Sequence, residues 1–137
     1  MTREELIALV KSRDAATVHG ALGIRIESFG AEKTVVAVDV SDRLYQHAGV
    51  VHGGVYVLLA ESAASIAAAL SVDMERFDVA GMEINANHLK KVTSGTLRAT
   101  ASRLHRGRSS MIYGIEVTDG EGDNVCLSRC TIAIRER

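Results

Sequence analysis

One apolar stretch, Val55 to Leu70, constrains this chain more than any other feature. The region from Gly54 to about Met74 is rich in Ala and Leu, which favour helices, and its apolar residues lie on nearly all sides of the predicted helix. A helix of this kind is typical of a protein interior rather than of a half-exposed surface. Its small residues allow a sheet to approach closely; they are Ala60, Ala63, Ala64, Ala67 and Ala68.

Length and composition narrow the protein class. The stretch is short for a membrane span and contains Glu61, so we expect no membrane association. The 137 residues fit a single domain, residues 1–137. The net charge of −1 gives little electrostatic reason for nucleic-acid binding.

Cys126 and Cys130 lie in one strand-like run about 13 Å apart, too far for a disulfide bond. With a charged chain start that is unlike a secretory signal, a reduced, cytoplasmic protein is expected.

The remaining chain reads as one short helix and a series of strands. The apolar and charged residues from Thr2 to Arg13 alternate as in an amphipathic helix. Thr2 and Glu5 are predicted to form a capping box at the start of this helix. The order β-β-α-β-β-β-β predicts an α+β fold, an antiparallel sheet wrapped around one long central helix. An exposed outer sheet face favours an oligomer. The strand-like runs are Leu22–Phe29, Lys33–Val40, Val79–Lys91, Gly95–His105, Ser109–Thr118 and Asn124–Ile134, and the predicted hairpin turns after the helix are Thr93–Gly95, Arg106–Arg108 and Asp119–Gly122.

Two glycines, Gly53 and Gly54, mark the start of the central helix. Unpaired N–H groups and the positive end of the helix dipole there stabilise an anion, including the oxyanion of a tetrahedral intermediate. Ordinary turn formation before a helix is the alternative explanation for the pair. His52 either donates a hydrogen bond or caps the helix, and Gln46 either holds a carbonyl oxygen or satisfies the loop backbone. His47 and His52 are not separated from any Cys or Asp by the spacings typical of metal ligands, so no metal site is expected.

Glu61 is the only charged residue within the apolar stretch. Burying an isolated carboxylate is unfavourable unless it is paired, neutralised or facing a site; an exposed helix edge or a structural hydrogen-bond network is the alternative. Ser65, one turn later, either orients the carboxylate or a water or bonds back to a helix carbonyl. Gly53 and Glu61 are eight residues apart, about 12 Å along a helix. A site that uses both must therefore combine two protomers.

The segment Ile84 to Ile115 contains six basic residues and no Asp or Glu. At its predicted turn, the guanidinium groups of Arg106 and Arg108 and the backbone at Gly107 are suited to phosphate. A solvated strand face is the alternative. Aromatic residues make up only 4% of the chain, too few for a base-stacking surface.

Taken together, these motifs resemble the hotdog-fold acyl-CoA thioesterases, especially the branch acting on aryl-CoA and acyl-carrier thioesters. The resemblance spans about Leu22 to Ile134. It implies homodimers or homotetramers with active sites between protomers, and hydrolysis of an aromatic or medium-chain acyl-CoA without a separate cofactor, since CoA is part of the substrate. The motifs are Gln46-His47, Val51-His52-Gly53-Gly54, Leu59-Ala60-Glu61-Ser62, Glu83-Ile84-Asn85-Ala86-Asn87-His88 and Leu104-His105-Arg106-Gly107-Arg108.

The resemblance also implies a role for each matching residue. Glu61 becomes the catalytic carboxylate, acting as nucleophile or as general base on water. Gly53 supplies the oxyanion N–H, Gln46 and His52 position the thioester, and Ser65 supports the attack. The implied CoA-binding residues are Gly54, His88, Lys90, Arg106, Gly107 and Arg108.

Two other functions remain open. A hotdog hydratase or dehydratase of acyl thioesters uses an acid–base pair, and His47 and Glu61 lie fourteen residues apart, a similar spacing. Those enzymes surround the histidine with prolines, whereas this chain has no proline. A non-catalytic acyl-CoA binding module is the second alternative.

Overall fold

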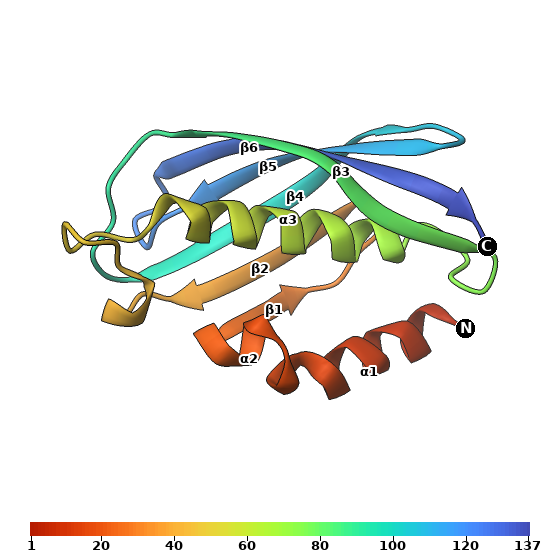
Figure 1. Ribbon diagram of the computed structural model, residues 1–137, viewed down its shortest axis with the longest axis horizontal. Helices are drawn as coiled ribbons and strands as arrows, with labels where there is room; N and C mark the ends of the chain where they lie inside the picture. The colour runs from red at the N-terminus through yellow and green to blue at the C-terminus, as the bar shows by residue number, and fades with distance from the viewer.

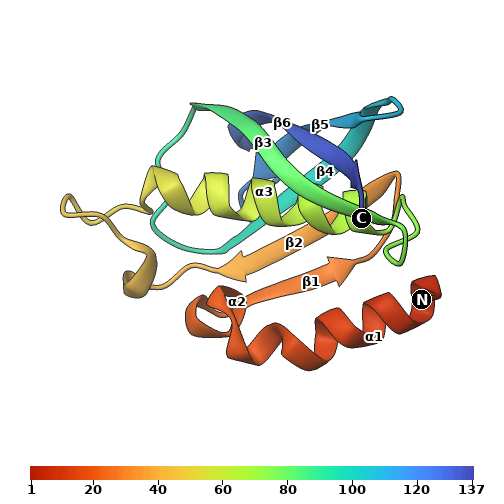
Figure 2. The same cartoon turned by 45° about the vertical axis from the view of Figure 1, so that its right-hand side comes forward.

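The central helix of the fold is α3 (Gly53–Ala69), which lies against a six-stranded antiparallel sheet in the computed structural model of residues 1–137 (Figure 1). The sheet curls around one side of this helix (Figure 2). The predicted contact side is confirmed, because Ala60, Ala63, Ala64, Ala67 and Ala68 are all fully buried. The α+β arrangement expected from the order of the elements is therefore confirmed.

The sheet has the strand order β1-β2-β4-β5-β6-β3. The β4–β5 and β5–β6 connections are hairpins, as predicted. The hairpin predicted at Thr93–Gly95 is wrong, because β3 pairs with β6 and the following segment carries the chain across to β4. The alternation of apolar and polar residues shows which face of a strand is buried, but it does not show which strand pairs with it. The strands are β1 (Ile24–Ser28), β2 (Lys33–Asp39), β3 (Phe77–His88), β4 (Thr96–Arg106), β5 (Ser110–Thr118) and β6 (Asn124–Glu136).

The inner face of the sheet supplies the rest of the core. On β5, Tyr113, Ile115 and Val117 are buried, while Glu116 between them is exposed, which confirms the predicted alternation. Both cysteines of β6 are buried and free. Strand β3 is an edge of the sheet, and most of its residues are exposed.

Helix α3 ends at Ala69, several residues before the predicted end near Met74. The Ser71 hydroxyl donates to the Ala67 carbonyl at 2.9 Å, and the Asp73 carbonyl accepts from the N–H of Phe77 at 2.9 Å. These local bonds replace further helical turns and direct the chain into β3.

The N-terminal residues 3–22, which we call the cap, contain α1 (Arg3–Arg13), the 3₁₀ turn η1 (Asp14–Ala16) and α2 (Val18–Leu22). Both hydrogen bonds of the Thr2–Glu5 capping box are present. Helix α2 was not predicted, and the strand expected from Leu22 therefore begins only at Ile24. Gly23, with φ of 74°, ends α2 in the left-handed conformation.

The loop predicted from Ser41 to His52 contains one further short element, the 3₁₀ turn η2 (Asp42–Leu44). None of the helices is both long enough and apolar enough to span a bilayer.

Candidate active site

The start of α3 presents one open backbone donor. His52 is the N-cap residue, and its Nδ1 accepts a hydrogen bond from the Gly54 N–H at 2.8 Å, so His52 has the capping role. The Gly53 N–H lies in the first turn and donates no hydrogen bond within the chain. A Cβ at Gly53 would lie 2.8 Å from Nε2 of His88. Glycine therefore keeps this N–H open beside the imidazole.

A cavity of about 380 Å³ lies beside this helix start; we call it the Gly53 cavity. It brings together four of the predicted site residues, Gln46, Gly53, His88 and Lys90. The rings of Tyr56 and His88 pack with centroids 5.4 Å apart. The Gln46 side-chain oxygen accepts from the N–H of residue 48, so in this chain it satisfies the loop backbone.

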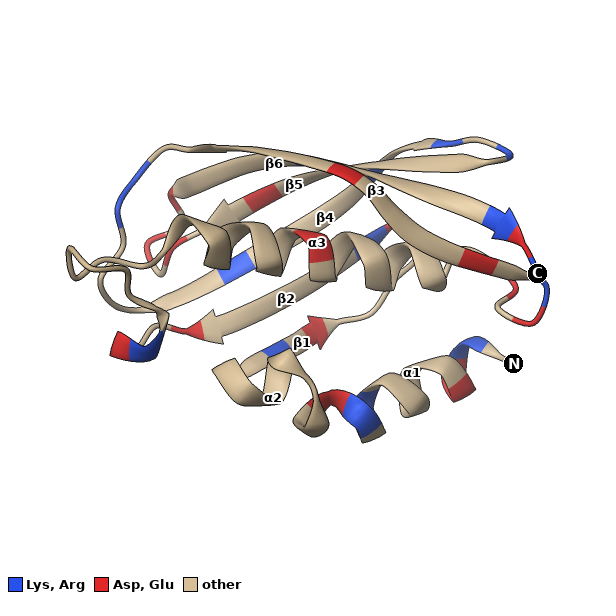
Figure 3. Cartoon of the chain, viewed as in Figure 1, with Lys and Arg blue, Asp and Glu red and all other residues tan.

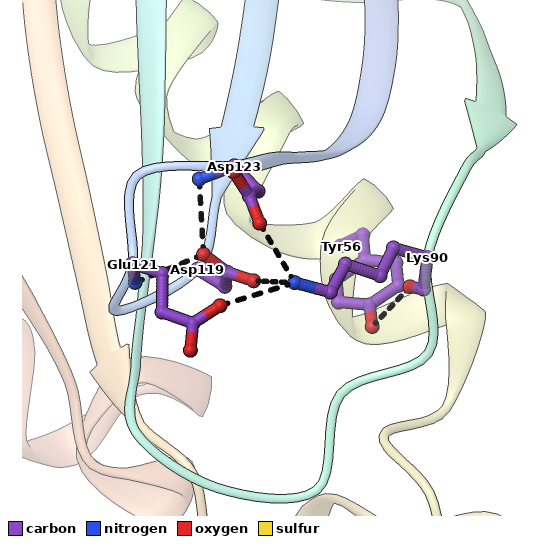
Figure 4. Close-up of polar contacts among 5 residues, drawn as sticks. All are labelled: Tyr56, Lys90, Asp119, Glu121 and Asp123. Carbon is purple, nitrogen blue, oxygen red and sulfur yellow. Dashed lines mark hydrogen bonds and ion pairs between the residues drawn. The ribbon is translucent and has the colours of Figure 1, made fainter.

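Lys90 is held by three carboxylates of the β5–β6 turn (Figure 4). Its Nζ lies 2.7 Å from Asp119 Oδ2, 2.9 Å from Asp123 Oδ2 and 3.5 Å from Glu121 Oε2. Hydrogen bonds to Asp119 and Asp123 raise the pKa of Lys90, and the bond from Lys90 lowers the pKa of Asp119. These carboxylate oxygens lie within 4.8 Å of one another, and the Lys90 ammonium supplies the positive charge there. The Tyr56 hydroxyl donates to the Lys90 carbonyl at 3.4 Å.

A second group of predicted site residues lies midway along α3, where Figure 3 shows a single acidic segment. Glu61 is exposed and forms no hydrogen bond or ion pair within the chain. It therefore occupies an exposed edge of α3, which the core of the sheet does not cover. It lines a cavity of about 530 Å³, the Glu61 cavity, between α3 and the cap. Ser65 lines the same cavity, on the same helix face.

The Glu61 carboxylate rests on strand β3 at Gly81. A Cβ at Gly81 would lie only 2.6 Å from Glu61 Oε1, so any larger residue would displace the carboxylate. The β3–β6 pairing is irregular between Gly81 and Glu83, which marks a bulge at this contact. Sequence reasoning missed Gly81, although a glycine inside a strand-like run signals a bulge or a close approach.

Other predicted residues lie outside both cavities. Arg106, Gly107 and Arg108 form the β4–β5 turn, at the opposite end of the molecule from the start of α3 (Figure 1). Arg106 and Arg108 are exposed and form no ion pair, whereas Arg98 binds Glu27 at 2.8 Å. The basic segment is thus partly neutralised by acidic residues from elsewhere in the chain.

The exposed His47 lines neither cavity. The two groups of candidate site residues are therefore separate within one chain. The open Gly53 N–H and the unpaired Glu61 carboxylate lie in different cavities, eight residues apart, about 12 Å along the helix.

Comparison with known proteins assigns the family. A family model described as the thioesterase superfamily matches residues 48–126. A 1,4-dihydroxy-2-naphthoyl-CoA hydrolase of Listeria monocytogenes is 44% identical over 116 residues, which cover 85% of this chain and 94% of the relative. A protein of the same name from Escherichia coli is 39% identical over 115 residues, 84% of each chain.

Solved structures agree with the sequence matches. The crystal structure of a mutant thioesterase from Pseudomonas aeruginosa has a TM-score of 0.88 and 34% identity, and covers 100% of this chain and 96% of that one. A thioesterase from Haemophilus influenzae has a TM-score of 0.86 and 35% identity, with coverage of 99% and 92%. Both the sequence and the fold are therefore shared over almost the full length. This chain belongs to the thioesterase superfamily and has the hotdog fold that its motifs predict.

Proposed function

We propose that this protein hydrolyses acyl-CoA thioesters to a free acid and CoA, at an active site formed by two copies of the chain. The observation that carries the proposal is the pair of unused groups on α3. Glu61 has no partner in the Glu61 cavity, and the Gly53 N–H has none in the Gly53 cavity. The names of the two CoA hydrolase relatives support the substrate class.

The proposed chemistry needs water as its only co-reactant, so we assign no cofactor. The Gly53 N–H and the positive end of α3 polarise the thioester carbonyl and stabilise the oxyanion. Glu61 then attacks the carbonyl carbon, giving an anhydride that water hydrolyses, or it takes a proton from a water that attacks directly. In either route the C–S bond breaks and CoA leaves as the thiol. Gln46 lines the Gly53 cavity beside the carbonyl, His52 holds the helix start through its bond to the Gly54 N–H, and Ser65 supports the attack.

The second copy is proposed to pair along strand β3. This edge strand is 12 residues long and mostly exposed, with Met82 63% exposed. A long unpaired edge is a template for pairing with another strand. Antiparallel pairing of two β3 strands joins two sheets and runs the two α3 helices past each other. The start of one helix then lies near Glu61 of the other, in a homodimer or in a tetramer built from it.

We assign the substrate-binding residues from the side chains that line the two cavities and from the arginines that form no ion pair. Apolar side chains of the Glu61 cavity, including Leu58 and Ile66, suit an aromatic or medium-chain acyl group. Arg106 and Arg108 form no ion pair, although Arg106 donates to the Gly107 carbonyl, and we assign their guanidinium groups to the CoA phosphates. The His88 ring is assigned to the CoA moiety beside the start of α3, while the N–H groups of Gly54 and Gly107 are already bound, to His52 Nδ1 and to the Ser110 carbonyl, so these two glycines are assigned only to leaving room for the CoA moiety. Since Lys90 is bound to three carboxylates, we assign it to shaping the Gly53 cavity rather than to holding phosphate.

The test is release of free thiol from benzoyl-, naphthoyl- and medium-chain acyl-CoA. Glu61→Gln is expected to lower turnover by about 10³-fold, because it removes the base or nucleophile while preserving side-chain size. Glu116→Gln, an equivalent change of an exposed glutamate on β5, is the control and retains activity. Wild-type turnover in Glu61→Gln would disprove the assignment. An enoyl product without free CoA would indicate the hydratase or dehydratase, and tight CoA binding without turnover would indicate a binding module.

A further inference from the structure

A three-residue hydrogen-bond chain links the cap to the catalytic helix. Nδ1 of His19 lies 2.8 Å from Asp14 Oδ1, and Nε2 of His19 lies 2.9 Å from the Ser62 hydroxyl. The three residues come from η1, α2 and α3, and all three line the Glu61 cavity. His19 is one of two buried polar residues of the chain, at 8% exposure.

The direction of these bonds follows from their chemistry. A carboxylate only accepts hydrogen bonds, so Nδ1 of His19 carries the hydrogen that Asp14 receives. The Ser62 hydroxyl then donates to Nε2 when the imidazole is neutral, or accepts from it when the imidazole is protonated. The chain of bonds persists in both states, and Asp14 fixes the orientation of the ring.

Apart from apolar packing, the cap has few other attachments to α3. No residue of α1 is buried, and the bond between His19 and Ser62 is the only hydrogen bond between residues 3–22 and α3. The cap nevertheless supplies one wall of the Glu61 cavity, through Leu9, Val10 and Val18. The opposite wall belongs to α3. One polar contact therefore connects the two walls beside the candidate catalytic carboxylate.

We propose that Asp14, His19 and Ser62 act as positioning residues, which hold the cap against α3 and set the width of the Glu61 cavity. This inference rests on the proposed function, because the wall matters to catalysis only if the acyl group occupies that cavity. An acyl group large enough to contact the cap depends on these residues for binding, whereas an acetyl group does not. The chemical step at Glu61 is left unchanged.

The test compares a large and a small substrate. In His19→Ala and in Ser62→Ala, the KM for decanoyl-CoA or benzoyl-CoA rises about tenfold, while kcat stays within about twofold and the KM for acetyl-CoA is unchanged. His19→Gln, whose amide both donates and accepts, restores part of the loss. Ser128→Ala removes a comparable 2.8 Å hydrogen bond, to the Asn85 carbonyl outside the cavity, and changes no KM.

Two further measurements make the inference refutable. The double variant His19→Ala with Ser62→Ala is expected to be no worse than either single variant, because both remove the same contact. In His19→Ala, amide hydrogen exchange accelerates in residues 3–22 but not in α3. Additive losses, an equal rise in KM for acetyl-CoA, or unchanged exchange in the cap would each overturn it. If no acyl-CoA releases thiol, the proposed function fails, whereas the exchange measurement still tests the attachment.

Discussion

Replacing Gly81 by alanine tests whether β3 holds the Glu61 carboxylate in its working position. Gly81 does not have a positive φ, so alanine fits its backbone conformation. The new Cβ would lie 2.6 Å from Glu61 Oε1 and 3.7 Å from the carboxyl carbon. To reach ordinary van der Waals separation, the carboxylate must move by about 0.8 Å.

A displacement of this size is expected to have little effect on the stability of the fold but a large effect on the rate of catalysis. A 1 Å misplacement of a reacting group lowers rates by about 10²-fold, so kcat of Gly81→Ala is expected to fall by about that factor. The free energy of unfolding should stay the same or rise by about 0.4–1 kcal/mol, since alanine reduces the freedom of the unfolded chain. Loss of activity without loss of stability is therefore the expected signature.

Thiol release and thermal unfolding of the same preparations measure both quantities. The matched control is Gly114→Ala on β5, where a Cβ would lie 3.2 Å from a terminal carbon of the exposed Leu104 side chain, which is free to move. Gly114→Ala is expected to keep wild-type kcat. If Gly81→Ala also keeps it, the carboxylate does not work from its position on β3 and the reasoning is refuted.

Two other predictions concern stability and reactivity. Because Lys90 lowers the pKa of the Asp119 carboxyl, its stabilisation is complete above the ordinary Asp pKa of about 3.9 and disappears as pH falls through the lowered value. Denaturant titrations should thus show wild type more stable than Lys90→Met at about pH 7 and the two converging at about pH 2; a constant difference would contradict this. Burial raises the pKa of Cys130 to about 11 and also raises that of Cys126. An aromatic disulfide reagent should therefore label neither thiol near neutral pH until the protein is unfolded, and rapid native labelling would contradict the burial.

The features that sequence predicted best are local or periodic. The apolar stretch around Leu59 predicts a central helix with a small-residue contact side, and the structure confirms both. Counting residues also predicts that Gly53 and Glu61 lie well apart along one helix, because the helical rise is constant, and they line different cavities. These inferences need no knowledge of which segments meet in space.

The features that sequence missed depend on long-range contacts. The pairing of β3 with β6 could not be read from alternation, which is the same for any partner strand. Nothing near Glu61 in the sequence indicates which side of an almost wholly apolar helix stays uncovered. Lys90 meets its carboxylates 29 and 33 residues later, and His19 meets Ser62 after 43 residues.

The central claim is that Glu61 of one copy works with the helix start of another, and mixing two inactive variants tests it most directly. Glu61→Gln lacks the carboxylate, and Gly53→Val fills the Gly53 cavity against His88. After subunit exchange, about half of the dimers contain one chain of each kind, and one of their two sites then has both intact groups. The account predicts that thiol release recovers to about a quarter of the wild-type rate. A mixture that exchanges subunits, as shown by mass-tagged chains, yet stays as inactive as its parents would contradict it.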